Sequence, residues 1–294
     1  MRNINKLALA AMSSALLISS CNSGDGFKTT ENGLQYKIVK DEKSGETAKE
    51  GDVVVMHLHT MIGDSTVFDS RKFNGNQPVE YPLNAPTFKG DVPEGIMMMS
   101  AGDSAIFKVS LDSIKKTGAQ TLPWMQDGDM VTYYVNLVAI KGKAEIDKEM
   151  QEQRAQAEKQ MQTDDLLLQE YFTKNGIKAE KSASGIYYQI QTQGTGNNIQ
   201  PGQVVSINYT GKTLDGKIFD SNVEPGSVNN QPLTFRAASG EMIAGMDEGM
   251  TYLKKGSKAK LYIPSPLAYG PQSPTPDIAP NSVLIFEVEV LDVK

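Results

Sequence analysis

Cysteine, histidine and tryptophan are nearly absent from this chain of 294 residues, which has one cysteine, two histidines and one tryptophan. A single cysteine excludes an internal disulfide. The formal net charge of −6 is mild, which argues against binding nucleic acid without sequence preference, since such binding needs a basic face. There is no nucleophile elbow, phosphate-binding glycine loop or cluster of metal-ligand residues. The sequence therefore predicts neither a cofactor nor a nucleic-acid partner.

The longest apolar run lies in the first twenty residues and is too short to cross a bilayer. Two basic residues precede the run 7–18, whereas a spanning helix needs about 20 apolar residues. This arrangement is typical of a secretory signal peptide, which we place at 1–20. Small residues then precede Cys21, which resembles the lipobox of bacterial lipoproteins. We interpret Cys21 as the lipidation site and 21–32 as a lipidated polar tether.

A lipid anchor predicts that the protein sits on a membrane without crossing it. Each buried methylene of an acyl chain contributes about 0.8 kcal/mol, so several chains anchor stably. The alternative for Cys21 is a buried free thiol, which its place before any foldable segment disfavours. The predicted location is the bacterial cell envelope, at the outer membrane facing the periplasm.

The rest of the chain contains an internal repeat. Similar segments recur in the same order, at an offset of 151 to 154 residues. Each match is weak alone, but the shared order and spacing favour a duplication. The matched pairs are Gly33–Ile38 with Gly185–Ile190, Phe68–Ser70 with Phe219–Ser221, Gln77–Pro78 with Gln231–Pro232, Gly95 and Gly102 with Gly249 and Gly256, and Val131–Lys141 with Leu284–Lys294.

Within each copy the pattern predicts mostly strands. β-branched or alternating runs at Val53–His59 and Val204–Tyr209 follow turn residues. Alternation of polar and apolar residues over Ser257–Ile263 and Leu284–Val293 indicates half-buried antiparallel strands. The stretch Met242–Leu253 has a helical spacing and is predicted as one short helix. Each copy is therefore α+β, a curved antiparallel β-sheet wrapped on a short α-helix.

Between the copies, 144–174 is rich in Glu, Gln, Lys and Ala and contains no glycine or proline, which predicts one long helix or two in succession. Its apolar residues form a narrow stripe that Gln153 and Asp164 interrupt. One interpretation is a homodimer along this stripe, and the other is a solvated spacer that docks lightly on its own domains. The stretch 166–172 is apolar enough to pack on something. The stripe consists of Ile146, Met150, Ala157, Met161, Leu168 and Tyr171.

Six motifs of the second copy, spread over some eighty residues, resemble the signature of the FKBP-type peptidyl-prolyl cis-trans isomerases. They are Ile207–Gly211, Leu214–Ser221, Ile243–Gly249, Lys255–Lys258, Ile263–Gly270 and Pro280–Val288. The resemblance implies two FKBP-like domains joined by a helical spacer. We place a degenerate FKBP-like domain at 33–142, the spacer at 143–176 and an isomerase domain at 177–294.

The resemblance also implies a substrate pocket. Carried over position by position, its catalytic residues are Tyr269, Asp220 and Phe219, and its substrate-binding residues are Tyr209, Leu233, Met242, Ile243, Met246, Ile278 and Phe286. The aromatic residues, Met246 and Ile278 would line a slot for the proline ring. The Tyr269 hydroxyl would donate to a substrate carbonyl and the Ile243 N–H would bind the substrate main chain. Asp220 would lie at the edge of the pocket.

Each role has a simpler alternative. Buried aromatic residues are usually core, Asp220 could order the turn after Phe219, and Tyr269 could be a packing residue. The sequence also departs from the family, because Met246 stands where a tryptophan is usual and 271–280 differs from the commonest flap. A methionine floor predicts a deeper, looser pocket.

The first copy keeps Phe68 and Asp69 but loses most of the aromatic wall. Leu58, Lys89 and Val92 stand at the positions of Tyr209, Ile243 and Met246, Tyr133 replaces Phe286, and Leu-Ala-Tyr-Gly has no counterpart. We expect this copy either to bind unfolded or proline-containing chains without catalysis or to be purely structural. His57 and His59 share one strand face, and exposed histidines are favoured there over a metal site.

The leading prediction is a peptidyl-prolyl isomerase that assists the folding of exported proteins. The alternative is a non-catalytic chaperone or adaptor lipoprotein that binds extended polypeptides. The predicted partners are unfolded or proline-containing polypeptides, the membrane through the lipid anchor, a second copy through the spacer and, by the resemblance, macrolide inhibitors.

Overall fold

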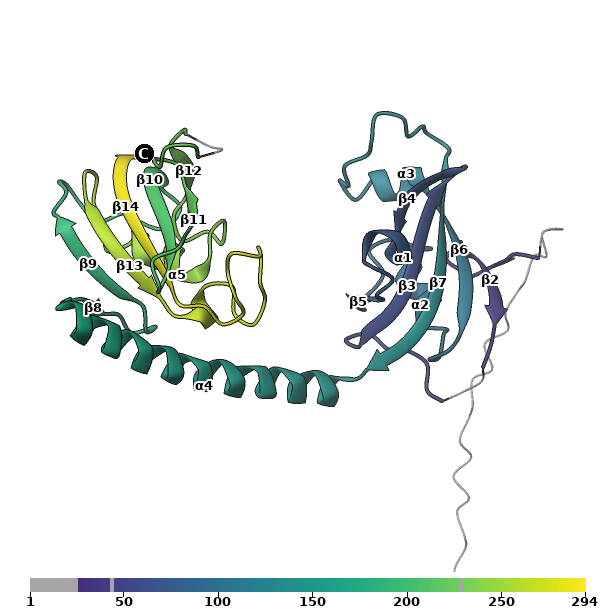
Figure 1. Ribbon diagram of the computed structural model, residues 1–294. Helices are drawn as coiled ribbons and strands as arrows, with labels where there is room; N and C mark the ends of the chain where they lie inside the picture. The colour runs from purple at the N-terminus through teal and green to yellow at the C-terminus, as the bar shows by residue number, and fades with distance from the viewer. Residues whose placement is uncertain (1–25, 43–44, 228–229) are drawn as a thin grey trace, which may run out of the picture. The chain divides into compact units, whose positions relative to one another are not determined.

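The computed structural model describes residues 26–42, 45–227 and 230–294, so the predicted signal peptide and Cys21 lie outside the described residues. The chain divides into two compact units, 1–149 and 150–294. Each unit contains one antiparallel sheet of seven strands (Figure 1). None of the described helices combines the length and the apolar character that a bilayer span requires.

The sheet of the first unit has the strand order β1-β2-β6-β7-β3-β4, with β5 paired to β3. Three short helices connect its strands. The strands are β1 (Lys28–Thr29), β2 (Gln35–Lys40), β3 (Val53–Ile62), β4 (Ser65–Asp69), β5 (Val79–Pro82), β6 (Ser104–Ser110) and β7 (Met130–Lys141), and the helices are α1 (Ser70–Phe73), α2 (Val92–Ile96) and α3 (Leu111–Lys115).

The sheet of the second unit repeats this order, running β8-β9-β13-β14-β10-β11 with β12 paired to β10. The two sheets therefore share one topology, as the repeat predicted, and the α+β fold class is confirmed. The elements are β8 (Glu180–Lys181), β9 (Tyr187–Thr192), β10 (Val204–Thr213), β11 (Ile218–Ser221), β12 (Leu233–Arg236), β13 (Lys258–Ile263) and β14 (Leu284–Val293), with α5 (Ala244–Met250) and the 3₁₀ turn η1 (Ser265–Leu267).

Alternation along the strands gives each sheet an inner face that carries the core. In the second unit Val205, Ile207, Leu261 and Ile263 are fully buried and point to the side that α5 covers. Glycines let the helix lie close to the sheet, because a Cβ on Gly249 would come within 2.5 Å of Leu261 Cδ1. The equivalent helix α2 of the first unit uses the same device, with Gly95 against Phe107.

Helix α5 is shorter than the predicted span Met242–Leu253. Ile243 has extended backbone (ψ 145°) and is the N-cap, so the helix begins at Ala244. At the other end, Tyr252 N–H and Leu253 N–H donate to the carbonyls three residues earlier, which closes the helix in tight turns. The apolar spacing correctly predicted a helix here, but the predicted span also includes the residues that precede and follow it.

The predicted spacer is one helix, α4 (Lys143–Asn175), and its second half belongs to the second unit. Leu168 and Phe172 are buried against the outer face of the sheet, opposite α5, together with Tyr187, Tyr262 and Ile285. The Phe172 and Tyr262 rings meet edge to face, with centroids 4.9 Å apart. Figure 1 shows α4 running past β8 toward β9. The apolar stretch 166–172 therefore packs on its own domain, although Leu166 and Leu167 themselves are exposed.

The first sheet begins earlier than the predicted tether allows. Lys28 and Thr29 form β1 and pair with Tyr36 and Gln35. Phe27 is buried, with the ammonium of Lys108 4.0 Å from the centre of its ring. A cation over the face of an aromatic ring is attracted to it, so this contact stabilises the buried position of Phe27. The end of the predicted tether is therefore part of the fold.

Candidate functional site

Five predicted site residues of the second unit form one apolar group, which we call the aromatic cluster: Tyr209, Phe219, Met246, Ile278 and Phe286. They come from β10, β11, α5, the loop before β14, and β14 itself. The Phe219 and Phe286 rings meet edge to face with centroids 5.7 Å apart, and the Tyr209 and Phe286 centroids are 6.5 Å apart. Met246, Ile278 and Phe286 are buried, whereas Tyr209 and Phe219 are half-buried. The cluster thus has a closed floor and a partly open aromatic wall.

Gly211 makes room for this wall. A Cβ at this position would lie 2.6 Å from Phe219 Cζ, closer than real contacts allow, and 3.1 Å from Phe286 Cε1, which is a tight contact. Gly211 pairs with Phe286 on one side and with Asp220 on the other. The glycine of the Tyr-Thr-Gly motif is therefore part of the site, although its role was not predicted.

Asp220 joins the cluster through Tyr209. The Tyr209 hydroxyl donates to Asp220 Oδ2 at 2.6 Å. Burial and this hydrogen bond raise the pKa of Tyr209 above its usual value. The following turn is ordered by other groups, since Ser221 Oγ accepts from Val223 N–H and Glu224 N–H. The simpler role considered for Asp220, ordering the turn, therefore belongs to Ser221.

Two hydrogen-bond donors border the cluster. The Ile243 N–H precedes the first turn of α5, and no group among the described residues accepts its hydrogen bond. The Tyr269 hydroxyl likewise has no partner in the described part of the chain, and the side chain is 37% exposed. Burial and the nearby Asp220 carboxylate raise the pKa of Tyr269, so the hydroxyl keeps its proton at neutral pH. Both groups can donate to an incoming carbonyl.

The flap 271–280 is closed on itself by one contact and tied to the residue before β11 by another. Ser273 Oγ lies within hydrogen-bond distance of the Thr275 and Ile278 carbonyls, and its single hydroxyl hydrogen closes the loop on itself. Lys217 and Asp277 form an ion pair at 2.8 Å. Ile278, which lies in the same flap, is buried in the cluster.

The remaining predicted residues, Leu233, Met242 and Ile243, pack against the same core half-buried. Leu267 and Ala268 do so as well, and they were not predicted. They belong to the η1 turn that leads to Tyr269, within the motif Ile263–Gly270, so the motif pointed to the segment but not to these two side chains.

The corresponding region of the first unit is filled differently. Tyr133, at the position of Phe286, packs against a small buried group formed by Ile62, Leu111 and Val131. Burial, with the nearby Asp91, raises the pKa of Tyr133 to about 12. Asp69 accepts from Arg71 N–H and caps α1, whereas its counterpart Asp220 accepts from a tyrosine. The first unit therefore lacks the second unit's polar pair and its tyrosine donor.

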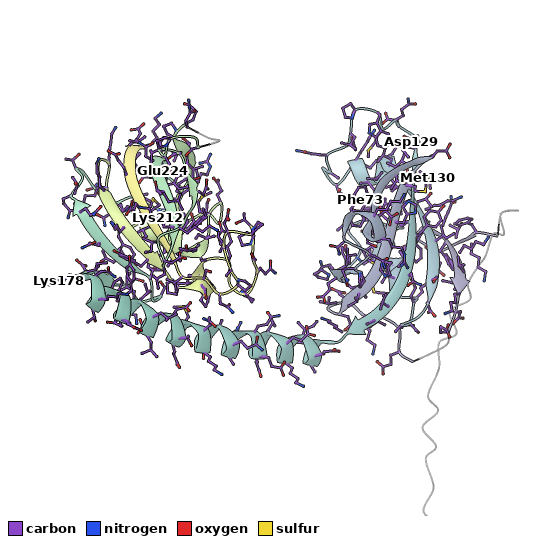
Figure 2. The ribbon with its side chains drawn as sticks, viewed as in Figure 1. Phe73, Asp129, Met130, Lys178, Lys212 and Glu224 are labelled. Atoms are coloured by element: carbon purple, nitrogen blue, oxygen red, sulfur yellow. The ribbon has the colours of Figure 1, made fainter. Side chains whose placement is uncertain are left out.

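The outer sheet faces of the two units also differ. In the first unit a hollow of about 380 Å³ is lined by His57, His59 and Tyr134 among others, and the His59 and Tyr134 rings stack 5.4 Å apart. The second unit has a hollow of the same volume on this face, but charged residues line it, among them Lys260 and Glu287. Lys212 (labelled in Figure 2) and Lys260 both pair with Glu287, at 2.8 and 2.7 Å. The histidines are half-buried rather than exposed. Across the ranges described, no group of three or more His, Cys, Asp or Glu residues could hold a metal ion.

The chain is similar to known proteins of one family. The family model of the FKBP-type peptidyl-prolyl cis-trans isomerases matches residues 44–117 and 196–291. A probable FKBP-type isomerase of Haemophilus influenzae is 42% identical over 118 residues, covering 40% of this chain and 46% of that protein. Isomerase FkpA of Escherichia coli K12 is 40% identical over 126 residues, or 43% of each chain. The crystal structure of E. coli FkpA matches with a TM-score of 0.38 and 35% identity, covering 53% of this chain and 75% of that one.

The chain spans about half the length of the curated relatives it matches. The two stretches that match the family model lie one in each unit and together make up more than half of the chain. With two sheets of one topology and a second unit that assembles the aromatic cluster, the chain belongs to the FKBP-type peptidyl-prolyl cis-trans isomerase family.

Proposed function

We propose that the second unit catalyses cis-trans isomerisation of X-Pro bonds in polypeptides. The observation that carries this proposal is the aromatic cluster with two donors at its border, Ile243 N–H and the Tyr269 hydroxyl, that have no acceptor among the described residues. No group in it is a nucleophile, and isomerisation breaks no covalent bond.

The chemistry requires stabilisation of a twisted amide. Resonance gives the X-Pro amide a rotation barrier of about 18–20 kcal/mol, and the uncatalysed reaction takes tens to hundreds of seconds. The twisted amide is less dipolar than the planar one, so moving it from water into an apolar site costs less free energy than moving the planar amide. Each tenfold acceleration needs about 1.4 kcal/mol of preferential stabilisation, so four decades need about 5–6 kcal/mol.

Each residue of the site has a role that follows from its position. The wall formed by Tyr209, Phe219 and Phe286 holds the proline ring over the floor of Met246 and Ile278. Ile243 N–H binds a carbonyl of the substrate main chain, and Tyr269 donates to a second carbonyl. Asp220 fixes the Tyr209 ring through the 2.6 Å hydrogen bond.

The test is a proline-peptide isomerisation assay on the full chain. We expect Tyr269→Phe to lower kcat/KM about tenfold, because one hydrogen bond to the substrate is lost. Combining it with Phe219→Ala should lower kcat/KM further, toward the uncatalysed rate. An unchanged rate in the double variant, or no acceleration by the wild type, rejects the proposal.

Tyr252→Phe is the matched control. Tyr252 stacks on Tyr188 with ring centroids 4.5 Å apart, outside the aromatic cluster, and its hydroxyl donates to Glu248. The Tyr252→Phe variant loses one tyrosine hydroxyl, as Tyr269→Phe does, and should keep the wild-type kcat/KM.

A second proposal concerns the first unit, which we infer binds unfolded or proline-containing polypeptides without catalysis. Large apolar side chains stand exposed on its connecting segments: Phe73 (Figure 2) at 68%, Leu122 at 49% and Trp124 at 46%. Trp124 is the only tryptophan, so its emission reports on this unit alone. Adding a permanently unfolded polypeptide should shift the emission to the blue; an unchanged spectrum speaks for a purely structural unit.

The sequence motif around Cys21 supports a proposal on anchoring and location. We propose that Cys21 is acylated and holds the protein on the outer membrane, facing the periplasm, where exported chains would be its substrates. Cys21→Ser should abolish incorporation of labelled fatty acid and release the protein from the membrane fraction.

Two further partners are proposed with separate tests. Macrolide inhibitors of the family should occupy the aromatic cluster and inhibit isomerisation competitively. Dimerisation along the first half of α4, where Met150 is 43% exposed, predicts a doubled mass in sedimentation.

A further inference from the structure

The helix α4 places one carboxylate inside the second unit. Asp164 is fully buried, although it interrupts an apolar stripe in the sequence. Its Oδ2 accepts two hydrogen bonds from Ser265, from the N–H and from the hydroxyl, each at 2.7 Å. Its Oδ1 accepts from Gln160 Nε2 at 2.8 Å. A buried carboxylate is costly unless it is hydrogen-bonded, so this contact is specific.

Ser265 begins the turn that carries Tyr269. Ser265 is fully buried and is the first residue of η1. Its carbonyl accepts from Ala268 N–H at 3.0 Å and from Gly270 N–H at 2.8 Å, so both neighbours of Tyr269 are bonded to the residue that Asp164 holds. A chain of hydrogen bonds thus runs from the helix to the backbone on each side of the tyrosine.

The described part of the first unit has no such connection. Leu111 follows β6 there, as Ser265 follows β13 after Pro264, and its N–H donates to the carbonyl of Asp129 in the neighbouring loop. Ser110 before it makes no side-chain cap to α3. The carboxylate contact therefore occurs in the unit that keeps the tyrosine donor, and the unit without the donor closes the turn through its own backbone.

We propose that Asp164 is a positioning residue for isomerisation, which holds the η1 turn so that the Tyr269 hydroxyl stays at the border of the aromatic cluster. The inference rests on the proposed function of that cluster. Misplacing a catalytic group by about 1 Å can cost about 100-fold in rate, so loosening the turn should be visible in kcat/KM.

The experiment compares four full-length variants. Asp164→Ala leaves two Ser265 donors without an acceptor, and should lower kcat/KM about tenfold. Asp164→Asn keeps one oxygen for Ser265 and should restore kcat/KM to within about twofold. Asp165→Ala is the matched control, since Asp165 Oδ1 accepts from Lys181 and Tyr187 and ties the same helix turn to the sheet, but not to η1. Ser265→Ala removes only the hydroxyl donor and gives an intermediate loss should Asp164→Ala fail to fold.

A second readout does not depend on activity. Amide hydrogen exchange at Ala268 and Gly270, followed by NMR, should accelerate about tenfold or more in Asp164→Ala and stay unchanged in Asp165→Ala and Asp164→Asn. Equal exchange and equal kcat/KM in Asp164→Ala and Asp165→Ala overturn the inference. If the wild type accelerates no proline peptide, the proposed function fails, and the exchange rates still decide whether Asp164 holds the turn.

Discussion

Single side chains in the second unit show how closely the site and the core are fitted. Gly211 leaves space for the Phe219 ring, and Tyr209 is fixed by Asp220 at 2.6 Å. On the opposite face, the Tyr262 hydroxyl is buried with no hydrogen-bond partner among the described residues. The first two residues serve the aromatic cluster, whereas the third bears only on the stability of the fold.

Gly211→Ala tests the fit of the aromatic wall. The added methyl group would overlap Phe219 and force the ring to move, at a cost of about 1–3 kcal/mol in the free energy of unfolding. We expect kcat/KM to fall at least tenfold. Gly142→Ala is the control, because the closest atom to its Cβ is 3.9 Å away. Equal activity of the two variants would contradict the role given to Gly211.

Tyr262→Phe tests the unpartnered hydroxyl. Because a buried polar group without a partner costs about 1–3 kcal/mol, its removal should raise the free energy of unfolding by about 1 kcal/mol at pH 8. Burial raises the pKa of Tyr262 to about 12. The usual tyrosine pKa is about 10, so the hydroxyl ionises first in the unfolded state and the free energy of unfolding of the wild type falls as the pH rises from about 10 to 12. The variant has no hydroxyl to ionise here and does not show this fall. Urea unfolding at pH 8 and pH 11 measures both effects, and parallel losses in the two proteins would refute the assignment.

At the scale of elements, α4 is part of the second unit from Met150 onward, rather than a separate spacer. Its 33 residues form one helix, and Leu168 and Phe172 complete an aromatic core on the outer sheet face. Neighbouring residues on the same helix turn, Leu166 and Leu167, stay exposed. The helix therefore contributes to stability through one face only.

Leu168→Ala and Leu167→Ala form a matched pair for this claim. The first removes a fully buried side chain and should lower the free energy of unfolding of the second unit by about 2–5 kcal/mol. The second changes a side chain that is 44% exposed and should cost less than about 0.5 kcal/mol. Chemical denaturation followed by circular dichroism measures the difference, and similar costs would show that α4 does not dock.

For the whole molecule, the division of the chain matters to any experiment on an isolated domain. The second unit begins at Met150, whereas the sequence placed the isomerase domain at 177–294. A fragment that starts at residue 177 lacks Asp164, Leu168 and Phe172. We expect fragment 177–294 to be at least about 3 kcal/mol less stable than 150–294, since two large buried side chains are lost. Coincident urea midpoints of the two fragments would argue against this boundary.

The sequence alone predicted the elements whose signal is local. β14 occupies the predicted span Leu284–Val293 because alternation persists to both of its ends. α5 came out shorter than predicted because apolar spacing does not mark the extended N-cap Ile243. The contact of Asp164 with Ser265 joins residues 101 positions apart, and no motif includes both. Likewise β1 and Phe27 lie in a segment whose composition is that of a tether, and only pairing with β2 orders it.

The charge ladder on β13 and β14 has a consequence for how two tandem copies of one fold avoid exchanging strands. In the native register Lys258 faces Glu289 and Lys260 faces Glu287. If β13 took the place of β6, the same lysines would face Asn136 and Tyr134 of β7, without a partner charge. Opposite charges across a strand pair stabilise it, so during folding the ladder favours pairing of β13 with β14 over pairing of β13 with β7. Glu287→Gln together with Glu289→Gln should then lower the yield of monomeric, active protein on refolding, and a full yield would show that the copies are sorted by other means.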